Sequence, residues 1–397
     1  MTVPADEVLL GDQFTVEVGP VAHGGHCVAR APDGRVVFVR YALPGERVTV
    51  SVTDVLAHQL RADAVEVHEP SPDRVEPPCP WAAPGLCGGC DFQHATPAAQ
   101  AELKGAVVRE QLVRLGRLSP DEVDALGVRV EPLGEPLGWR TRVRYAVDAT
   151  GRAGLLAHRS HEVVPVDWCR IATAAVRAAE VTQARWPRDD RVDVVASSGG
   201  DVTVVGSSTG RLSGPAQVRE RAVGREWRLP VDAFWQVHPA APDTLAAAVL
   251  DLIEPSPGER AWDLYGGAGL FAAALAPRVA EVTLVESAAP AVAAARTALA
   301  DLTNVHIVRS TVERFRASER PDLVVLDPPR SGAGAAVVRR LAASGPRAIA
   351  YVACDPAAFA RDVATFAGQG WRLARLRAFD CFPMTHHVEC VGLLVPA

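Results

Sequence analysis

The chain has 397 residues, of which 48% are hydrophobic and 22% charged, as in ordinary soluble proteins, and this length allows two or three domains. Its formal net charge of -6 argues against a protein that coats nucleic acid through bulk charge, and no apolar run is long enough to cross a bilayer. The first ten residues carry acidic side chains and no basic ones, unlike a targeting segment, and we expect a cytoplasmic protein.

Residues 1–69 are predicted to form a small β-barrel. From residue 13 onward, short runs alternate apolar and polar side chains, and turn sequences such as Gly24-Gly25 and Pro44-Gly45 separate them. This pattern predicts an antiparallel barrel of OB-like character, a fold that often binds RNA. Acidic residues outnumber arginines in this stretch, so a purely structural role stays open.

Residues 70–100 combine a proline-rich linker with a cluster of cysteines. Cys79, Cys87 and Cys90 fall within twelve residues, and Cys169 is the fourth candidate ligand. Four thiolates are a common ligand set for an iron-sulfur cluster or a structural zinc ion, and the spacing alone fits either. It is not the three-cysteine spacing of radical S-adenosylmethionine enzymes, and disulfides are not expected in the cytoplasm.

Residues 101–228 are predicted to form a mixed α+β central domain. Thr96-Pro97 opens an amphipathic helix that leads into it, with Thr as the N-cap and Pro at the first helical position. Farther on, one strand places Arg140, Arg142 and Arg144 on the same face. That face could contact phosphates or could be a solvated surface, and the sequence favours neither.

Residues 229–397 alternate strands and helices in the manner of a doubly wound, Rossmann-like sheet. After the first strand, Gly267 and Gly269 belong to a tight turn that lets the backbone approach a ligand. Glu286 ends the second strand about twenty residues on, where a carboxylate can accept ribose hydroxyls. The turn lacks the full dinucleotide fingerprint, so it favours S-adenosylmethionine over NAD.

The next strand ends in Asp327-Pro-Pro-Arg330, a rigid loop at the same edge of the sheet. Methyltransferases that act on amino groups commonly carry an aromatic residue at the last of these positions, where it stacks on the base. Arg330 stands there instead, which argues against methylation of an exocyclic amine.

Cys354 ends the fifth strand and Glu389 begins the last one. Either could be structural, the Cys as core filling and the Glu as a surface carboxylate. Beside a methyl donor, however, the pair suggests methylation of carbon 5 of uracil. A thiolate adds to carbon 6, the resulting enolate takes the methyl group, and a base removes the carbon 5 proton before the thiol is expelled. Cys354 would be the nucleophile and Glu389 the base. The neighbouring histidines are given no role.

Together these motifs resemble the bacterial RNA 5-methyluridine methyltransferases that act on transfer RNA or large-subunit ribosomal RNA, and the resemblance covers nearly the whole chain. It implies that residues 1–69 form a TRAM barrel and that a monomer acts on RNA in the cytoplasm. It also implies a [4Fe-4S] cluster, in preference to zinc, on the four cysteines Cys79, Cys87, Cys90 and Cys169.

The same resemblance assigns the methyltransferase site. It implies a nucleophilic Cys354 and a general base Glu389, and it places the cofactor against Gln236, Tyr265, Glu286 and Asp327. Leu270 departs from the family pattern, which often has Asn after the glycine turn. Two other functions remain: an inactive iron-sulfur protein that binds RNA, or a methyltransferase for another acceptor.

Overall fold

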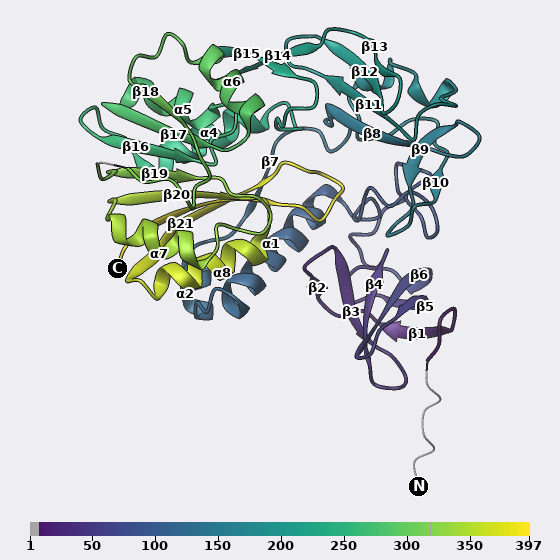
Figure 1. Ribbon diagram of the computed structural model, residues 1–397. Helices are drawn as coiled ribbons and strands as arrows, with labels where there is room; N and C mark the ends of the chain where they lie inside the picture. The colour runs from purple at the N-terminus through teal and green to yellow at the C-terminus, as the bar shows by residue number, and fades with distance from the viewer. Residues whose placement is uncertain (1–7, 318) are drawn as a thin grey trace.

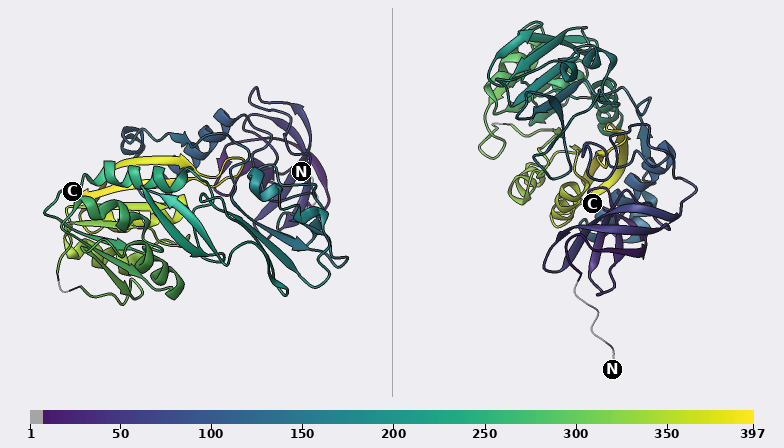
Figure 2. Two further views of the ribbon diagram at one scale, coloured as in Figure 1. Left: turned by 90° about the horizontal axis from the view of Figure 1, so that it is seen from above. Right: turned by 90° about the vertical axis from the view of Figure 1, so that its right-hand side faces the viewer.

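The computed structural model describes residues 8–317 and 319–397, so the first seven residues of the expected barrel domain and of the acidic N-terminus lie outside the described residues. Figure 1 shows three bodies: a small barrel near the N-terminus, a second β-rich body, and a large sheet flanked by helices. Figure 2 shows the same bodies from two further sides, with the barrel beside one end of the large sheet. No helix among the described residues combines the length and the apolar character needed to span a membrane.

The barrel is a six-stranded sheet in the order β1-β5-β6-β4-β3-β2. Alternate residues of β5, Val48, Val50 and Val52, point into its core, as the sequence pattern predicts. All neighbouring strands are antiparallel except β4 and β6, which pair in parallel, a difference from the expected antiparallel barrel. The strands are β1 (Gln13–Glu17), β2 (Val21–Ala22), β3 (His26–Arg30), β4 (Val36–Arg40), β5 (Arg47–Val55) and β6 (Gln59–Glu69).

Helix α1 (Pro97–Arg114) joins the barrel to the large sheet. Its N-terminus forms as predicted: the Thr96 side chain accepts a hydrogen bond from the backbone N–H of Ala99, and Pro97 begins the helix. Leu103 packs into the barrel core, whereas Leu112, farther along, packs into the core of the large sheet. One helix therefore fixes the barrel relative to the sheet.

The second body contains a six-stranded sheet in the order β10-β9-β8-β11-β12-β13, with a core of its own, and a separate hairpin, β14-β15. Its short helices are α3 (Ala174–Arg177) and the 3-10 turn η1 (Val181–Gln183). Its strands are β8 (Arg142–Val147), β9 (Ala153–Leu156), β10 (Val163–Val164), β11 (Arg191–Ala196), β12 (Val202–Gly206), β13 (Gly210–Ser213), β14 (Gln217–Ala222) and β15 (Arg225–Pro230).

The three arginines expected on one strand face do not form a common surface. Arg140 precedes β8, and its Nε donates to the carbonyl of Arg142. Arg142 is half-buried and pairs with Glu220, whereas the exposed Arg144 pairs with Asp193. Because each guanidinium is held by different neighbours, the strand is neither an open phosphate-binding face nor a freely solvated one.

The large sheet has eight strands in the order β18-β17-β16-β19-β20-β22-β21-β7, of which β18, β17, β16, β19 and β20 run parallel. Helices cover both faces, as predicted for a doubly wound sheet, and two apolar cores lie on its opposite sides. β22 then runs antiparallel to β20. The strands are β16 (Arg260–Leu264), β17 (Glu281–Glu286), β18 (Val305–Arg309), β19 (Leu323–Leu326), β20 (Ala348–Ala353), β21 (Trp371–Asp380) and β22 (Glu389–Pro396). The helices are α4 (Ala241–Ile253), α5 (Leu270–Leu275), η2 (Ala276–Arg278), α6 (Ala289–Ala298), α7 (Ala335–Ser344) and α8 (Pro356–Ala367).

Part of the stretch assigned to the central domain is built into this sheet. β7 (Val130–Pro132) pairs in parallel with β21 and forms the edge of the sheet, and Val123 of α2 (Pro120–Ala125) packs into its core. Trp227 of β15 also belongs to the sheet's core. A division of the sequence at one point could not anticipate this arrangement, because the apolar faces of these segments are buried against partners far away in the chain.

Candidate active site and cysteine cavity

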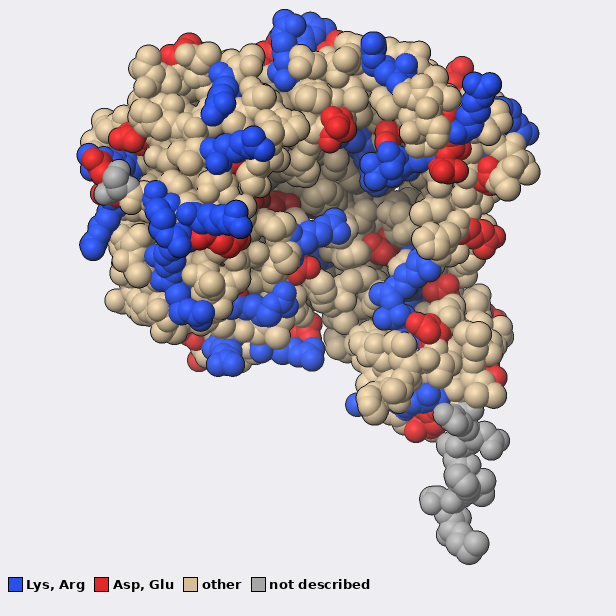
Figure 3. Space-filling model, in the orientation of Figure 1, with Lys and Arg blue, Asp and Glu red and all other residues tan. Residues whose placement is uncertain are grey.

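A cavity of about 930 Å³ opens at the carboxyl ends of the parallel strands, where the cysteine loop and the second body meet the large sheet. Ligands bind at this edge in open α/β sheets. Figure 3 shows the molecule hollowed between its three bodies. Seven of the eight residues that the sequence assigns to the methyltransferase site line the cavity: Gln236, Tyr265, Gly267, Glu286, Asp327, Cys354 and Glu389.

Gly269 is the exception, since it does not line the cavity. It has φ of 89° at the start of α5, and a Cβ there would lie 2.7 Å from a methyl carbon of Leu299. Its lack of a side chain serves packing of the helix and not the approach of a ligand. Gly267, with φ of 54°, does line the cavity.

Glu286 holds the glycine turn in place. Its carboxylate accepts hydrogen bonds from the backbone N–H groups of Gly267, at 3.1 Å, and of Ala288, at 2.6 Å. The turn after β16 is thereby tied to the end of β17, which puts both strand ends at one point of the cavity wall.

Two carboxyl groups at this edge have raised pKa values. Asp263 is completely buried, and its Oδ2 accepts from the backbone of Ala272 while its Oδ1 has no hydrogen-bond partner among the described residues. Burial raises the pKa of Asp263 to about 7. Burial and the neighbouring Asp263 raise the pKa of Asp327 to about 7 as well. Such groups suit a positively charged ligand, which would compensate their charge.

Cys354 and Glu389 face each other across two neighbouring strands. Cys354 directly follows β20, Glu389 is the first residue of β22, and the register pairs Ala353 with Cys390. Burial first, and then Glu389, raise the pKa of the Cys354 thiol to about 11. Burial and Asp327 raise the pKa of Glu389 well above its usual value. Both groups therefore favour their neutral forms.

Arg330 and His387 belong to the site, although the sequence gave them no role there. Both line the cavity, and Nη2 of Arg330 lies 3.5 Å from Nε2 of His387. The positive charge of Arg330 lowers the pKa of both Cys354 and Glu389, against the effect of burial. The sequence signal is the Arg at the fourth position of Asp327-Pro-Pro-Arg330, where the sequence pattern by itself indicates only that an aromatic residue is absent.

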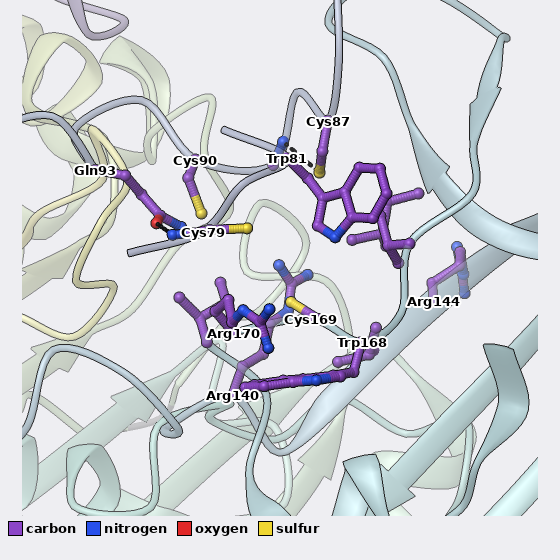
Figure 4. A pocket seen from close by; sticks show the side chains of 15 residues that line it. Cys79, Trp81, Cys87, Cys90, Gln93, Arg140, Arg144, Trp168, Cys169 and Arg170 are labelled. Carbon is purple, nitrogen blue, oxygen red and sulfur yellow. Dashed lines mark hydrogen bonds between the residues drawn. The ribbon is translucent and has the colours of Figure 1, made fainter. Parts of the chain in front are cut away.

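The four clustered cysteines surround a second, smaller cavity of about 60 Å³. Figure 4 shows their sulfur atoms around one space, with Trp81 and Trp168 beside it. The backbone N–H of Gly89 lies 3.4 Å from the sulfur of Cys87 and donates to it. Among the described residues, no three His, Cys, Asp or Glu side chains converge closely enough to hold a single metal ion. The four thiols come from the loop after the linker and, for Cys169, from the second body: Cys79, Cys87, Cys90 and Cys169.

These thiols suit a metal centre electrostatically. Burial is the first cause that raises the pKa of each of them, and for Cys87 it reaches about 11. Cys169 further raises the pKa of Cys79, because neighbouring thiolates repel one another. A cationic centre would remove both penalties. Gly89 and Arg140 line this cavity and the larger one, so the two are adjacent.

Comparison with known proteins gives two matches to family patterns. Residues 192–396 match the family described as tRNA (Uracil-5-)-methyltransferase, and residues 7–65 match the TRAM domain. The second match supports the expected N-terminal barrel.

Individual relatives extend these matches over almost the whole chain. An RNA methyltransferase of Streptomyces avermitilis is 48% identical, over 98% of this chain and 99% of its own. The 23S rRNA (uracil(1939)-C(5))-methyltransferase of Chromohalobacter salexigens is 33% identical, over 94% of this chain and 87% of its own. Among solved structures, the tRNA (uracil-54, C5)-methyltransferase of Pyrococcus abyssi, in complex with S-adenosyl-L-homocysteine, has a TM-score of 0.71 at 22% identity, covering 96% of this chain and 99% of that one. That likeness confirms the fold.

Proposed function

Because the chain belongs to the tRNA (uracil-5-)-methyltransferase family and is an S-adenosylmethionine-dependent RNA methyltransferase, we propose that it methylates carbon 5 of uracil in a ribosomal or transfer RNA. The observation that carries this proposal is the pair formed by Cys354 and Glu389 at the wall of one cavity. A thiol and a carboxyl group on adjacent strands supply the nucleophile and the base that this reaction needs.

The reaction begins at Cys354. Its thiolate forms a bond to carbon 6 of uracil, and the electron pair of the 5,6 double bond moves into an enolate. S-adenosylmethionine supplies the methyl group to carbon 5 and leaves as S-adenosylhomocysteine. Glu389 then takes the proton from carbon 5, the double bond re-forms, and the bond between sulfur and carbon 6 breaks. The buried position of Glu389 raises its pKa and so makes its carboxylate a stronger base.

Five residues of the larger cavity are proposed to hold the methyl donor: Gln236, Tyr265, Gly267, Glu286 and Asp327. The donor carries a positive sulfonium and a positive amino group, and the carboxyl group of Asp327, which lines this wall, has the buried carboxyl group of Asp263 near it. Gly267 lets the backbone come near, and no atom of another residue lies within 4 Å of where its Cβ would be.

Exchange of the nucleophile tests the proposal. Cys354→Ala is expected to abolish transfer of a labelled methyl group to uracil in RNA, because no other thiol among the described residues lines the larger cavity, while binding of S-adenosylmethionine survives. Mass spectrometry of digested RNA would identify 5-methyluridine as the product. Full activity of the variant would refute the assignment of the nucleophile.

The smaller cavity is proposed to hold a [4Fe-4S] cluster, bound by the thiolates of Cys79, Cys87, Cys90 and Cys169. Anaerobically purified protein should then be coloured, with broad charge-transfer absorption near the violet, and Cys169→Ser should lose most of its iron. Cys27, a buried cysteine of the barrel core, provides the matched control Cys27→Ser. A colourless protein that carries zinc would contradict the cluster.

An RNA substrate fits the charge distribution near the larger cavity. Figure 3 shows basic side chains gathered over α7 and α8, on a protein whose net charge is negative. Arg339 of α7 and Arg361 of α8 are exposed, and within the described part of the chain they form no ion pair. Unpaired arginines at the surface suit contacts with phosphate groups. We expect the protein to bind this RNA in the cytoplasm.

A further inference from the structure

Residues 381–388 connect β21 to β22 and lead directly into Glu389, the proposed general base, and we call them the base loop. The loop contains neither helix nor strand, and Met384 in its middle has φ of 69°. It also contributes Phe382, Thr385, His386 and His387 to the wall of the larger cavity. Its conformation must therefore be imposed by what lies against it, and Figures 1 and 2 show the connection reaching from the sheet toward the barrel.

The residue after the third clustered cysteine holds this loop. Asp91 is buried, and its carboxylate Oδ2 accepts two hydrogen bonds from His386: one from the backbone N–H at 3.0 Å and one from the ring Nδ1 at 2.7 Å. The backbone N–H groups of Asp91 and Phe92 both donate to the carbonyl of Met384, at 2.9 and 3.0 Å. Four hydrogen bonds thus join two adjacent residues of the cysteine loop to the base loop.

The barrel holds Asp91 from the other side. Arg40, a buried residue at the end of β4, places its Nη2 3.7 Å from the carboxylate of Asp91. Gly25, in the turn between β2 and β3, packs so closely that a Cβ there would lie 2.8 Å from Cβ of His386 and 3.0 Å from Cβ of Asp91. The carboxylate of Asp91 is therefore fixed by groups from two bodies and has little freedom to move.

A chain of contacts leads from His386 toward Cys354 and Glu389. The rings of His386 and His387 lie 4.1 Å apart, and His387 in turn lies beside Arg330. Arg330 is the cation that acts on Cys354 and Glu389. Other contacts hold earlier parts of the loop: Lys104 donates to the carbonyl of Phe382, and the backbone N–H of Met384 donates to the side chain of Gln100. Asp91 instead fastens His386, which is three residues before Glu389.

We propose that Asp91 is a positioning residue for the removal of the carbon 5 proton, because its paired hydrogen bonds to His386 fix the end of the loop that presents Glu389. This inference rests on the proposed function. It also gives the cysteine loop a task in the reaction beyond carrying three of the four thiols, since the loop's own Asp91 sets the geometry of the base.

The order of the chemical steps makes the proposal testable. Bond formation by Cys354 and methyl transfer precede deprotonation, so a misplaced base leaves the methylated uracil attached to the protein. Asp91→Asn is expected to lower kcat about tenfold or more, as for other displaced catalytic groups, with little change in KM for RNA. During turnover it should accumulate a complex of protein and RNA that carries a labelled methyl group and survives denaturing electrophoresis.

The controls separate positioning from a general loss of stability. Asp189 is also buried and accepts hydrogen bonds from the backbone of Ser208 and Thr209, but it lies away from both cavities. Asp189→Asn should leave kcat unchanged and yield no covalent complex. His386→Asn removes the ring donor and keeps the backbone N–H, and Asp91→Asn combined with it should be little worse than Asp91→Asn alone, because both weaken the same contact.

Failure of the Asp91 proposal and failure of the proposed function give different results. The proposal is overturned if Asp91→Asn keeps the wild-type kcat. It is also overturned if the variant has a normal melting temperature and binds the methyl donor but loses activity without forming the methylated covalent complex. Should the variant not fold, the same criterion applies to His386→Asn. The proposed function fails separately: the unaltered protein would then form no 5-methyluridine, or Glu389→Gln would yield no covalent complex.

Discussion

Cys354 lies in surroundings that disfavour its thiolate. Burial and the neighbouring carboxyl group of Glu389 raise its pKa to about 11, and only Arg330 acts in the opposite direction among the causes named. Because the thiolate is the form that attacks, this pKa leaves the proposed nucleophile mostly protonated at neutral pH.

The rate of alkylation of the free protein measures the thiolate fraction of Cys354 directly. At pH 8 the thiolate of a group with a pKa of about 11 is about one part in a thousand, so iodoacetamide should modify Cys354 far more slowly than a free cysteine. The rate should rise about tenfold per pH unit up to pH 10, since the pKa is raised and the thiolate fraction grows with pH. Mass spectrometry would locate the modified residue.

Arg330→Met provides the matched comparison. Because the charge of Arg330 lowers the pKa of Cys354, its removal should slow alkylation further at every pH below 10. Cys354→Ser reports the background from other thiols. A rate that reaches its plateau below pH 9 would contradict the raised pKa.

At the scale of elements, a turn of the barrel packs against the ends of the strands that carry the site residues. The turn between β2 and β3 of the barrel packs against the base loop, and His23 in that turn contacts Asp355, the neighbour of Cys354, at 3.1 Å. Asp355 also caps α8 through the backbone N–H of Ala358. The barrel thus contacts both the residue after Cys354 and the loop that leads to Glu389.

Gly25→Ala tests this packing, with Gly34→Ala as the control. Both glycines have positive φ, 79° and 87°, so Ala costs about 1 to 2 kcal/mol of backbone strain at either position. Only at Gly25 does the added Cβ meet other residues, those of the base loop and the cysteine loop; at Gly34 it meets open space.

We therefore expect Gly34→Ala to lower the melting temperature by a few degrees and leave kcat unchanged. Gly25→Ala should lower both. Thermal unfolding and methylation assays of the two variants side by side provide the measurement. Equal kcat values for them would show that the turn does not constrain the base loop.

At the scale of the molecule, three bodies surround the larger cavity, and the arginine-bearing surface of α7 and α8 lies to one side of it. A single uracil occupies a small part of a cavity of about 930 Å³, and the remaining RNA has to be held by surfaces outside. Charge at those surfaces raises affinity for any RNA, whereas the walls of the cavity decide which base reacts.

The salt dependence of RNA binding measures how much the charge of this surface contributes to the affinity for RNA. Arg339→Ala and Arg361→Ala should each weaken binding at low salt and reduce the slope of log K against log salt concentration by about 1, since each removes one phosphate contact. Arg221, exposed on the hairpin and paired with Glu226, is the control, and Arg221→Ala should leave the slope unchanged. If all three variants show the wild-type slope, RNA does not contact α7 and α8.

The sequence determined the local elements and supplied the residues of the proposed site. β20 ends directly before Cys354 and α8 begins at Pro356, because an unbroken apolar run specifies a buried strand and Asp355-Pro356 specifies the start of a helix. Once the parallel sheet was predicted, its geometry placed Glu286, Asp327 and Cys354 at one edge. These inferences succeed because periodicity, caps and strand ends act over a few residues.

Only the tertiary structure decided which distant groups meet. Nothing near Asp91 in the sequence indicates that it binds His386, and the pairing of Arg142 with Glu220 is equally invisible there. β7 joins a sheet whose other strands begin more than a hundred residues later. Such contacts depend on the shape and burial of whole faces, so they are set by how the bodies pack and not by any short pattern along the chain.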